Sequence, residues 1–369
     1  MDSIVREVIS RAPEEPRVPE APTASMGVQT EDAELERILA SLRTNIKIIG
    51  IGGGGSNTID RLVEAGIIGA ELYACNTDAQ HLLTIRSPHK VLLGRRATRG
   101  LGAGALPQVG EEAAREAADE LRLLLHGADM VFITCGLGGG TGTGGAPVVA
   151  QLAKEAGALT IAVCTFPFRA EGAIRAENAE YGLEKLRAFA DTVVVIPNDK
   201  LLEIVPRLAL NAAFRVADDV LMRGIKGITE VITRPGLVNL DFNDIKTIMK
   251  GGGVAMIGLG ESDSENRAED AIVAAINSPL IDVDVSAATG ALVNVTGGND
   301  MSVSEAEQVA EIVQSRISPN ARIIWGAAID PTLQHKLRVM LILTGVRSKQ
   351  ILGPGEHLRG RETGVDFVR

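Results

Sequence analysis

The residues best suited to chemistry are the glycines and threonines of one turn, Gly136–Gly144 (GLGGGTGTG). The turn follows an apolar run at 129–135 and precedes an Ala/Val-rich stretch of helical character. Without β-carbons, several backbone N–H groups can approach one anion, while the threonine hydroxyls and the N-terminus of a helix add donors and a favourable dipole. The pattern predicts a site for nucleotide phosphates. A merely flexible linker is the alternative, but linkers are seldom framed by a strand and a helix.

This turn differs from the Walker A loop because no Gly-Lys-Ser/Thr follows it. The loop therefore supplies no lysine for the β- and γ-phosphates. A nucleotide held there needs another counter-charge, and Mg²⁺ bound through the phosphates is the one we expect.

A second glycine turn, Gly50–Asn57, follows an earlier apolar run. Gly50, Gly52 and Gly55 fit GxGxxG, and Asp78 follows a later strand, which alone indicates a dinucleotide site and an NAD-dependent oxidoreductase. That alternative requires a hydride-handling His or Lys constellation, which we do not find in the sequence, and it leaves Gly136–Gly144 unexplained. Two phosphate-directed turns suit a triphosphate held from both sides.

A third turn, Arg99–Ala105, is also rich in glycine. Alone it reads as an ordinary loop. Beside two phosphate turns, its exposed N–H groups predict a sensor that distinguishes a triphosphate from a diphosphate by ordering and relaxing.

Phe214 and Asp218 are four residues apart in a long helical pattern and so project from one face. An aromatic ring can stack on a base, and a carboxylate can accept hydrogen bonds from the N1–H and the amine of guanine. The ordinary alternative is a core phenylalanine beside an exposed aspartate.

Two further carboxylates, Asp241 and Asp244, lie three residues apart at an expected helix start. They could simply cap that helix. They also belong to a later part of the chain than the glycine turns, so if they act on a phosphate, it is one held by another subunit.

Apolar runs and helical stretches alternate along the chain, which predicts a mostly parallel sheet with helices on both faces and ligands at the carboxyl ends of the strands. The expected strands are 46–49, 71–75, 90–93, 130–135, 159–164, 192–196, 253–260, 290–297, 322–328 and 337–344. The expected helices reach about 65 and cover 110–125, 175–190, 208–233, 265–277 and 304–316.

We divide the chain into a disordered Pro-rich arm (1–30), an amphipathic helix (31–44), a nucleotide-binding domain (45–207), a central helix (208–234), a smaller α/β domain (235–346) and a mobile tail (347–369). The docking of partners could reside partly in the arm or at the apolar end of the tail.

Composition excludes several classes of protein. The 369 residues carry a formal net charge of −10 and no basic block with interleaved aromatics, which disfavours nucleic-acid binding. Three cysteines lie in expected strands and read as core residues, and five scattered histidines predict no metal site made of side chains. We expect no membrane span and no signal peptide, and therefore a cytoplasmic protein.

From Asn45 to Arg347 these motifs, in this order, resemble the FtsZ family, the prokaryotic relatives of tubulin, and the wording of several segments is most similar to archaeal members. The resemblance implies a Rossmann-type parallel-sheet GTPase domain, a central helix and a smaller domain. It implies a cell-division GTPase that polymerises head-to-tail, with GTP/GDP and Mg²⁺ at the contact between subunits. It also implies division proteins that anchor the filament to the membrane at mid-cell. A filament that controls cell shape shares these residues and stays open as an alternative.

The same resemblance assigns roles to individual residues. Those that would complete the neighbour's site and polarise water are Asp241, Asp244 and Asn239. Those that would bind the nucleotide are Gly52, Gly53, Gly54, Gly55, Ser56, Asn57, Asn76, Asp78, Gly102, Ala103, Gly104, Ala105, Gly138, Gly139, Gly140, Thr141, Gly142, Thr143, Gly144, Glu171, Arg175, Asn198, Phe214 and Asp218.

Overall fold

The structure is a computed structural model that describes residues 44–204, 210–233, 237–238, 240–281, 283 and 285–346. The predicted arm, the body of the amphipathic helix, the tail, the domain boundaries near 207 and 234, and Asn239 lie outside the described residues.

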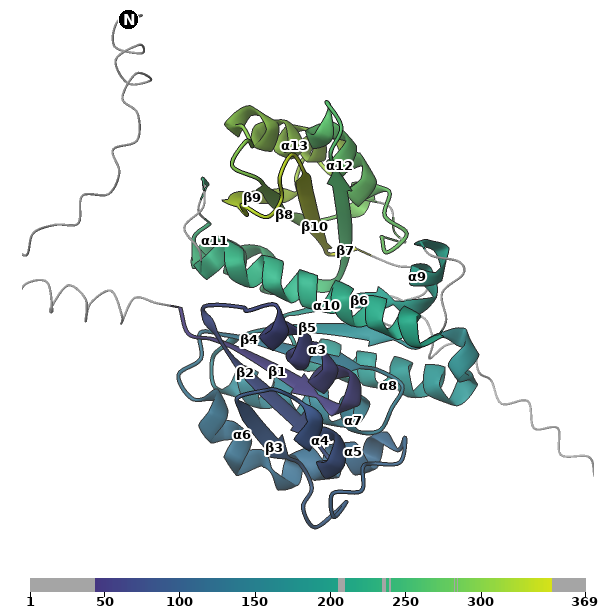
Figure 1. The fold of residues 1–369 in the computed structure, drawn as a ribbon. Helices are drawn as coiled ribbons and strands as arrows, with labels where there is room; N and C mark the ends of the chain where they lie inside the picture. The colour runs from purple at the N-terminus through teal and green to yellow at the C-terminus, as the bar shows by residue number, and fades with distance from the viewer. Residues whose placement is uncertain are drawn as a thin grey trace, which may run out of the picture. The chain divides into compact units, whose positions relative to one another are not determined.

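Ten strands form one sheet in the order β3-β2-β1-β4-β5-β6-β7-β10-β8-β9 (Figure 1). They are β1 Ile46–Ile51, β2 Ala70–Asn76, β3 His89–Leu92, β4 Met130–Gly136, β5 Leu159–Phe166, β6 Thr192–Pro197, β7 Gly253–Ser262, β8 Gly290–Gly297, β9 Arg322–Ile329 and β10 Leu337–Thr344. The pairs from β3 through β7 are parallel, whereas β10 runs antiparallel to both β7 and β8. The predicted mostly parallel sheet is confirmed.

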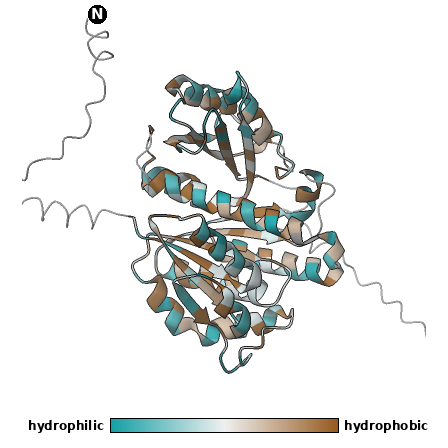
Figure 2. Cartoon of the chain, viewed as in Figure 1, coloured by the Kyte–Doolittle hydropathy of each residue, from teal (hydrophilic) through white to brown (hydrophobic). Residues whose placement is uncertain are grey.

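Helices cover both faces of this sheet. Towards one face lie α3 Gly52–Glu64, α4 Ala79–Thr84, α9 Asn198–Ile204, α10 Leu210–Thr233 and α11 Phe242–Met249. Towards the other lie α5 Pro107–Glu116, α6 Ala118–Leu125, α7 Thr141–Glu155, α8 Ala173–Phe189, α12 Arg267–Ile276 and α13 Val303–Arg316. In Figure 2 the hydrophobic colour concentrates on the strands, as expected for a sheet buried on both sides.

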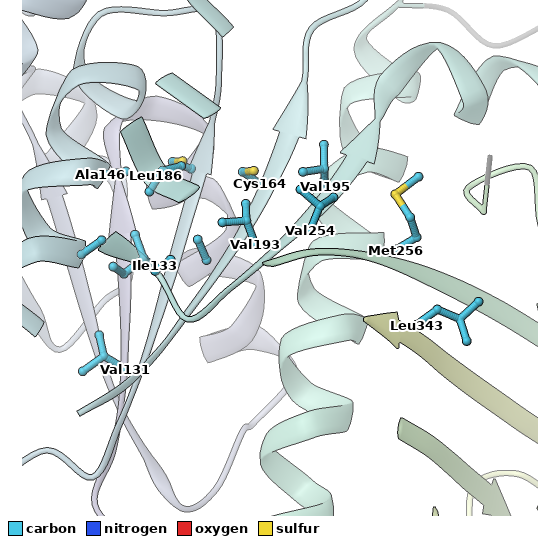
Figure 3. Close-up of a cluster of buried hydrophobic side chains, with 14 of the residues drawn as sticks. Val131, Ile133, Ala146, Cys164, Leu186, Val193, Val195, Val254, Met256 and Leu343 are labelled. Carbon is cyan, nitrogen blue, oxygen red and sulfur yellow. The ribbon is translucent and has the colours of Figure 1, made fainter. Parts of the chain in front are cut away.

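The strands of the predicted second domain extend the sheet of the first. β7 pairs with β6 in register Thr192↔Gly253. Buried side chains continue across this junction, from Val193 and Val195 through Val254 and Met256 (Figure 3). Each half thus shares a core with the other.

One predicted helix was wrong in its extent. The expected helix over 110–125 is two helices, α5 and α6, that meet at Ala117. The break allows Ala113 and Ala114 of the first helix and Leu121 and Leu125 of the second to be buried together.

α10 runs across one face of the sheet, from the carboxyl ends of the parallel strands to their amino ends. Near its start, the Phe214 ring lies edge-on to Phe168, just past the carboxyl end of β5, with centroids 5.2 Å apart. At its end, Thr233 Oγ1 donates to the carbonyl of Ile68, just before β2. At 1.5 Å per residue, these two points are about 28 Å apart along the helix.

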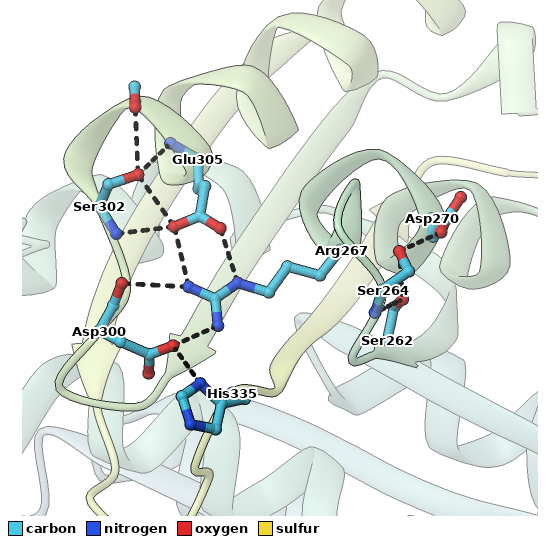
Figure 4. Close-up of polar contacts among 9 residues, drawn as sticks. Ser262, Ser264, Arg267, Asp270, Asp300, Ser302, Glu305 and His335 are labelled. Atoms are coloured by element: carbon cyan, nitrogen blue, oxygen red, sulfur yellow. Dashed lines mark hydrogen bonds and ion pairs between the residues drawn. The ribbon is translucent and has the colours of Figure 1, made fainter.

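In the smaller half, a charged cluster joins α12 to the start of α13. The guanidinium of Arg267, which is buried, donates to Asp300 at 2.7 Å and to Glu305 at 2.6 Å (Figure 4). The pKa of both carboxyls is lowered, chiefly by these hydrogen bonds.

Candidate functional site

The first and second glycine turns lie side by side, because β1 and β4 are parallel neighbours. Both strands end at the carboxyl edge of the sheet, by which we mean the side formed by the carboxyl ends of the parallel strands. A β-carbon at Gly52 would lie 2.9 Å from the backbone nitrogen of Gly142, and one at Gly54 would lie 3.3 Å from that of Gly136. The second turn, Gly50–Asn57, is in fact the opening turn of α3, which begins at Gly52.

The glycines of these turns serve two purposes. A β-carbon at Gly55 would meet the carbonyl of Thr134 at 2.3 Å, and one at Gly144 would meet that of Pro107 at 1.9 Å, so these glycines allow elements to pack closely. At Gly53 and Gly139 a β-carbon would meet no atom within 4 Å, and neither needs a positive φ. Packing does not explain those two glycines, which border open space.

The third turn lies against the same edge. Gly102 N–H donates to the carbonyl of Thr77 at 3.1 Å, and Ala79 N–H donates to that of Gly100 at 3.0 Å. Thr77 Oγ1 also lies 2.7 Å from Thr141 Oγ1 of α7. Gly102 and Gly104 border open space and have φ values of +88° and +57°. Backbone conformation alone therefore accounts for glycine at those two positions.

The loop after β5 closes another side. Glu171 receives the N–H of Phe168 at 2.9 Å and pairs with Arg175 at 2.6 Å. Arg175 is half exposed and its backbone packs against Gly138. It is thus a cation beside a glycine turn that has no lysine of its own.

Asp218 faces this edge from α10. It is largely buried and lies 3.7 Å from Arg61 of α3. Burial raises the pKa of Asp218 to about 6, and Arg61 opposes that rise. The neighbouring Phe214 is exposed enough to receive a flat ligand.

Two residues at this edge hold buried oxygens that find no hydrogen-bond partner among the described residues. They are Ser56 Oγ in α3 and Asn198 Oδ1 at the carboxyl end of β6. Both were predicted to bind nucleotide. Unpaired buried oxygens beside open glycine turns fit a polar ligand there.

Sequence reasoning missed two polar side chains at this edge. The ring of His81 lies 3.1 Å from both Asn57 Oδ1 and Asn76 Nδ2, and Asp78 caps α4 by accepting from the N–H of His81. Asn178 on α8 donates to the carbonyls of two different glycine turns. Neither stands in a glycine turn or in a recognisable motif, so spacing gives no signal for them.

Asp241 and Asp244 lie at the opposite side of the sheet, the amino edge, where the parallel strands begin. Asp241 caps α11 by accepting from Asn243 N–H at 3.0 Å, as the ordinary interpretation expects, and Asp244 is exposed in the first turn. The chain reaches α11 from the end of α10, beside the amino end of β2, and Met249 accepts a hydrogen bond from Thr192 at the amino end of β6. These acids therefore cannot meet the glycine turns within one chain.

Comparison with known proteins agrees with this geometry. Residues 45–206 match the GTPase domain of the Tubulin/FtsZ family, and residues 253–347 match the C-terminal domain of the FtsZ family. The chain is 58% identical over its whole length, and over the whole of the relative, to Cell division protein FtsZ 1 of Archaeoglobus fulgidus. The chain belongs to the FtsZ family of tubulin-like GTPases.

Other FtsZ proteins agree. FtsZ 1 of Halobacterium salinarum is 56% identical, with 98% of this chain and 93% of that protein covered. A solved structure of an empty FtsZ dimer from M. jannaschii is 55% identical, covers 85% of this chain and 92% of its own, and superposes with a TM-score of 0.82.

Membership in the FtsZ family overturns the oxidoreductase alternative and implies that the chain binds a guanine nucleotide. The cysteines behave as predicted: all three are buried and unpaired, and burial raises the pKa of Cys135 to about 12. Within the described ranges, no group of three or more His, Cys, Asp or Glu side chains could hold a metal ion. Nor does any helix there have the length and apolarity needed to cross a bilayer.

Proposed function

We propose that this FtsZ-family chain binds GTP at the carboxyl edge of its sheet and hydrolyses it only when the acids of a second copy, Asp241 and Asp244, arrive at that edge. The observation that carries the proposal is the separation of these two sets of residues to opposite edges of one sheet. Each chain then offers half a site at each end.

The glycine turns suit the phosphates. Gly53 and Gly139 border open space, so their backbone can approach an anion without steric hindrance. Arg175 supplies positive charge nearby. Mg²⁺, held mainly through phosphate oxygens, would supply the remaining neutralisation of the triphosphate.

The base site lies on α10. Phe214 offers a ring face or edge to the base, and Asp218 in its ionised form can accept two hydrogen bonds from guanine. Arg61, 3.7 Å from that carboxylate, favours its ionised form. Adenine lacks the matching pair of donors, so the site should prefer GTP to ATP.

Hydrolysis needs a water placed in line with the γ-phosphate and a group that takes its proton. An exposed carboxylate from the next chain, Asp244, can orient the water and accept the proton as the new P–O bond forms and the bond to GDP breaks. Asn239 would orient the same water. Docking and turnover are thereby coupled.

A contact between the carboxyl edge of one copy and the amino edge of the next is heterologous and does not close on itself, so it builds a filament. The relatives from Archaeoglobus fulgidus and Halobacterium salinarum are cell division proteins. We therefore assign the filament to the division ring at mid-cell, in preference to a cell-shape role, with membrane-anchoring division proteins as partners.

A mixing experiment tests the shared site. Asp244→Ala keeps its glycine turns but lacks the acid, whereas Gly139→Asp keeps the acid but places a negative charge where phosphate would lie. Neither variant alone should turn over GTP, and an equimolar mixture should recover part of the wild-type rate. If the variants co-assemble and the mixture stays inactive, the shared site is wrong.

A further inference from the structure

Asn178 joins two turns of the site. Its Nδ2 on α8 lies 3.1 Å from the carbonyl oxygen of Ala105 and 3.4 Å from that of Gly138. The side chain is half-buried. An amide nitrogen carries two hydrogens, so Asn178 can donate one to each carbonyl.

The bond to Gly138 sets the direction of the next N–H. In a trans peptide, the carbonyl of one residue and the N–H of the next point in opposite directions. When the Gly138 carbonyl is held towards α8, the N–H of Gly139 is turned away from α8. The Gly138 N–H is fixed too, because it donates to Thr143 Oγ1 at 2.9 Å. A β-carbon at Gly139 would meet no atom within 4 Å, so the backbone there borders open space from which a phosphate oxygen can approach the N–H.

The bond to Ala105 holds a strained residue. Ala105 has a φ of +57°, a left-handed conformation that costs a residue with a β-carbon about 1 kcal/mol or more. Outside the glycines, only Arg99 and His335 share this feature among the residues that the structure describes. A turn that holds a strained residue is able to switch between two arrangements.

We propose that Asn178 is a positioning residue that couples the phosphate turn, Gly136–Gly144, to the third turn, Arg99–Ala105. This inference rests on the proposed function of both turns. One amide makes the orientation of Gly139 depend on the third turn being in place. Contact between a γ-phosphate and the third turn then strengthens the binding of the nucleotide by the phosphate turn. Because GDP lacks that contact, Asn178 should increase the preference for GTP over GDP.

The test measures the dissociation constants of GTP and GDP with dilute, unpolymerised protein. Asn178→Leu keeps a similar shape but has no N–H donors, and Asn178→Ala serves if leucine does not fit. Asn178→Gln keeps the donors, and Glu180→Gln is a control at an exposed position of the same helix. We expect Leu or Ala to reduce the GTP-to-GDP preference about tenfold, the effect of losing a hydrogen bond of ordinary strength. Gln should retain part of the preference, and the control all of it.

A preference unchanged in Asn178→Leu and Asn178→Ala would overturn the coupling, and so would an equal weakening of both nucleotides, which indicates a merely structural role. Either result leaves the proposed function intact, provided that the wild-type chain binds GTP. A wild-type chain that binds neither nucleotide would overturn both.

Discussion

Two glycines of the same turn, Gly139 and Gly144, are glycines for different physical reasons. Gly144 is a glycine because α5 leaves no room for a side chain, whereas Gly139 has room for one on its open side. The sequence alone does not distinguish these two glycines. The difference becomes visible only when the neighbouring elements are in place, and it yields a matched pair of variants.

Gly139→Ala and Gly144→Ala should separate nucleotide binding from folding. Alanine at 144 would clash with the Pro107 carbonyl and should lower the free energy of unfolding by about 2 to 3 kcal/mol. Alanine at 139 should leave the free energy of unfolding nearly unchanged and weaken the binding of GTP. Denaturant unfolding and nucleotide titration measure the two effects. Loss of stability without loss of affinity at 139 would contradict the assignment of its open side to phosphate.

Asp218 should make GTP binding depend on pH. In the free chain its pKa is about 6, above its usual 3.8, so the stability that its neutral form contributes is complete below pH 3.8 and is lost as the pH rises through 6. In the proposed site guanine binds the ionised form of Asp218, so GTP should lower this pKa. Affinity for GTP should then be about tenfold weaker at pH 5 than at pH 7.

The comparison for that prediction is Asp218→Asn. Protonation of the triphosphate itself affects both proteins alike, so the difference between their pH profiles isolates the carboxyl group. Identical profiles would remove Asp218 from the base site.

At the scale of elements, α10 connects the two regions of the chain that form the proposed site. Its start lies beside the carboxyl ends of the parallel strands, where we propose that the base binds, and its end leads the chain to the amino ends, where Asp241 and Asp244 lie. Its buried face, which includes Leu221, Ile225 and Ile228, packs in one core with strands from both halves.

The charged cluster at the start of α13 should contribute to stability and not to nucleotide binding. Arg267→Met removes the donors that Asp300 and Glu305 share and should lower the unfolding midpoint by several degrees, because two carboxylates lose their partner. GTP affinity should stay as in wild type. The exposed Arg316→Met on the same half is the control, and an equal effect of both variants would show that the cluster has no special role.

The order of elements could be predicted from the sequence because long apolar runs and helical periods decide it. The short helices α4 and α9 and the break at Ala117 could not, since tertiary packing determines them. The glycine turns were recognisable as motifs. Asn178, His81 and Arg61 reach the site from helices, and only the three-dimensional register of those helices brings them there.

At the scale of the whole molecule, the proposed function places one half-site at each edge and so makes assembly and hydrolysis one process. The measurement that tests this most directly is GTP turnover per molecule as a function of protein concentration. We predict almost no turnover in dilute protein, a threshold, and then a constant rate for each additional assembled subunit. A rate per molecule that stays constant down to the most dilute protein would show that one chain holds a complete site, and would leave Asp241 and Asp244 as residues of a helix start.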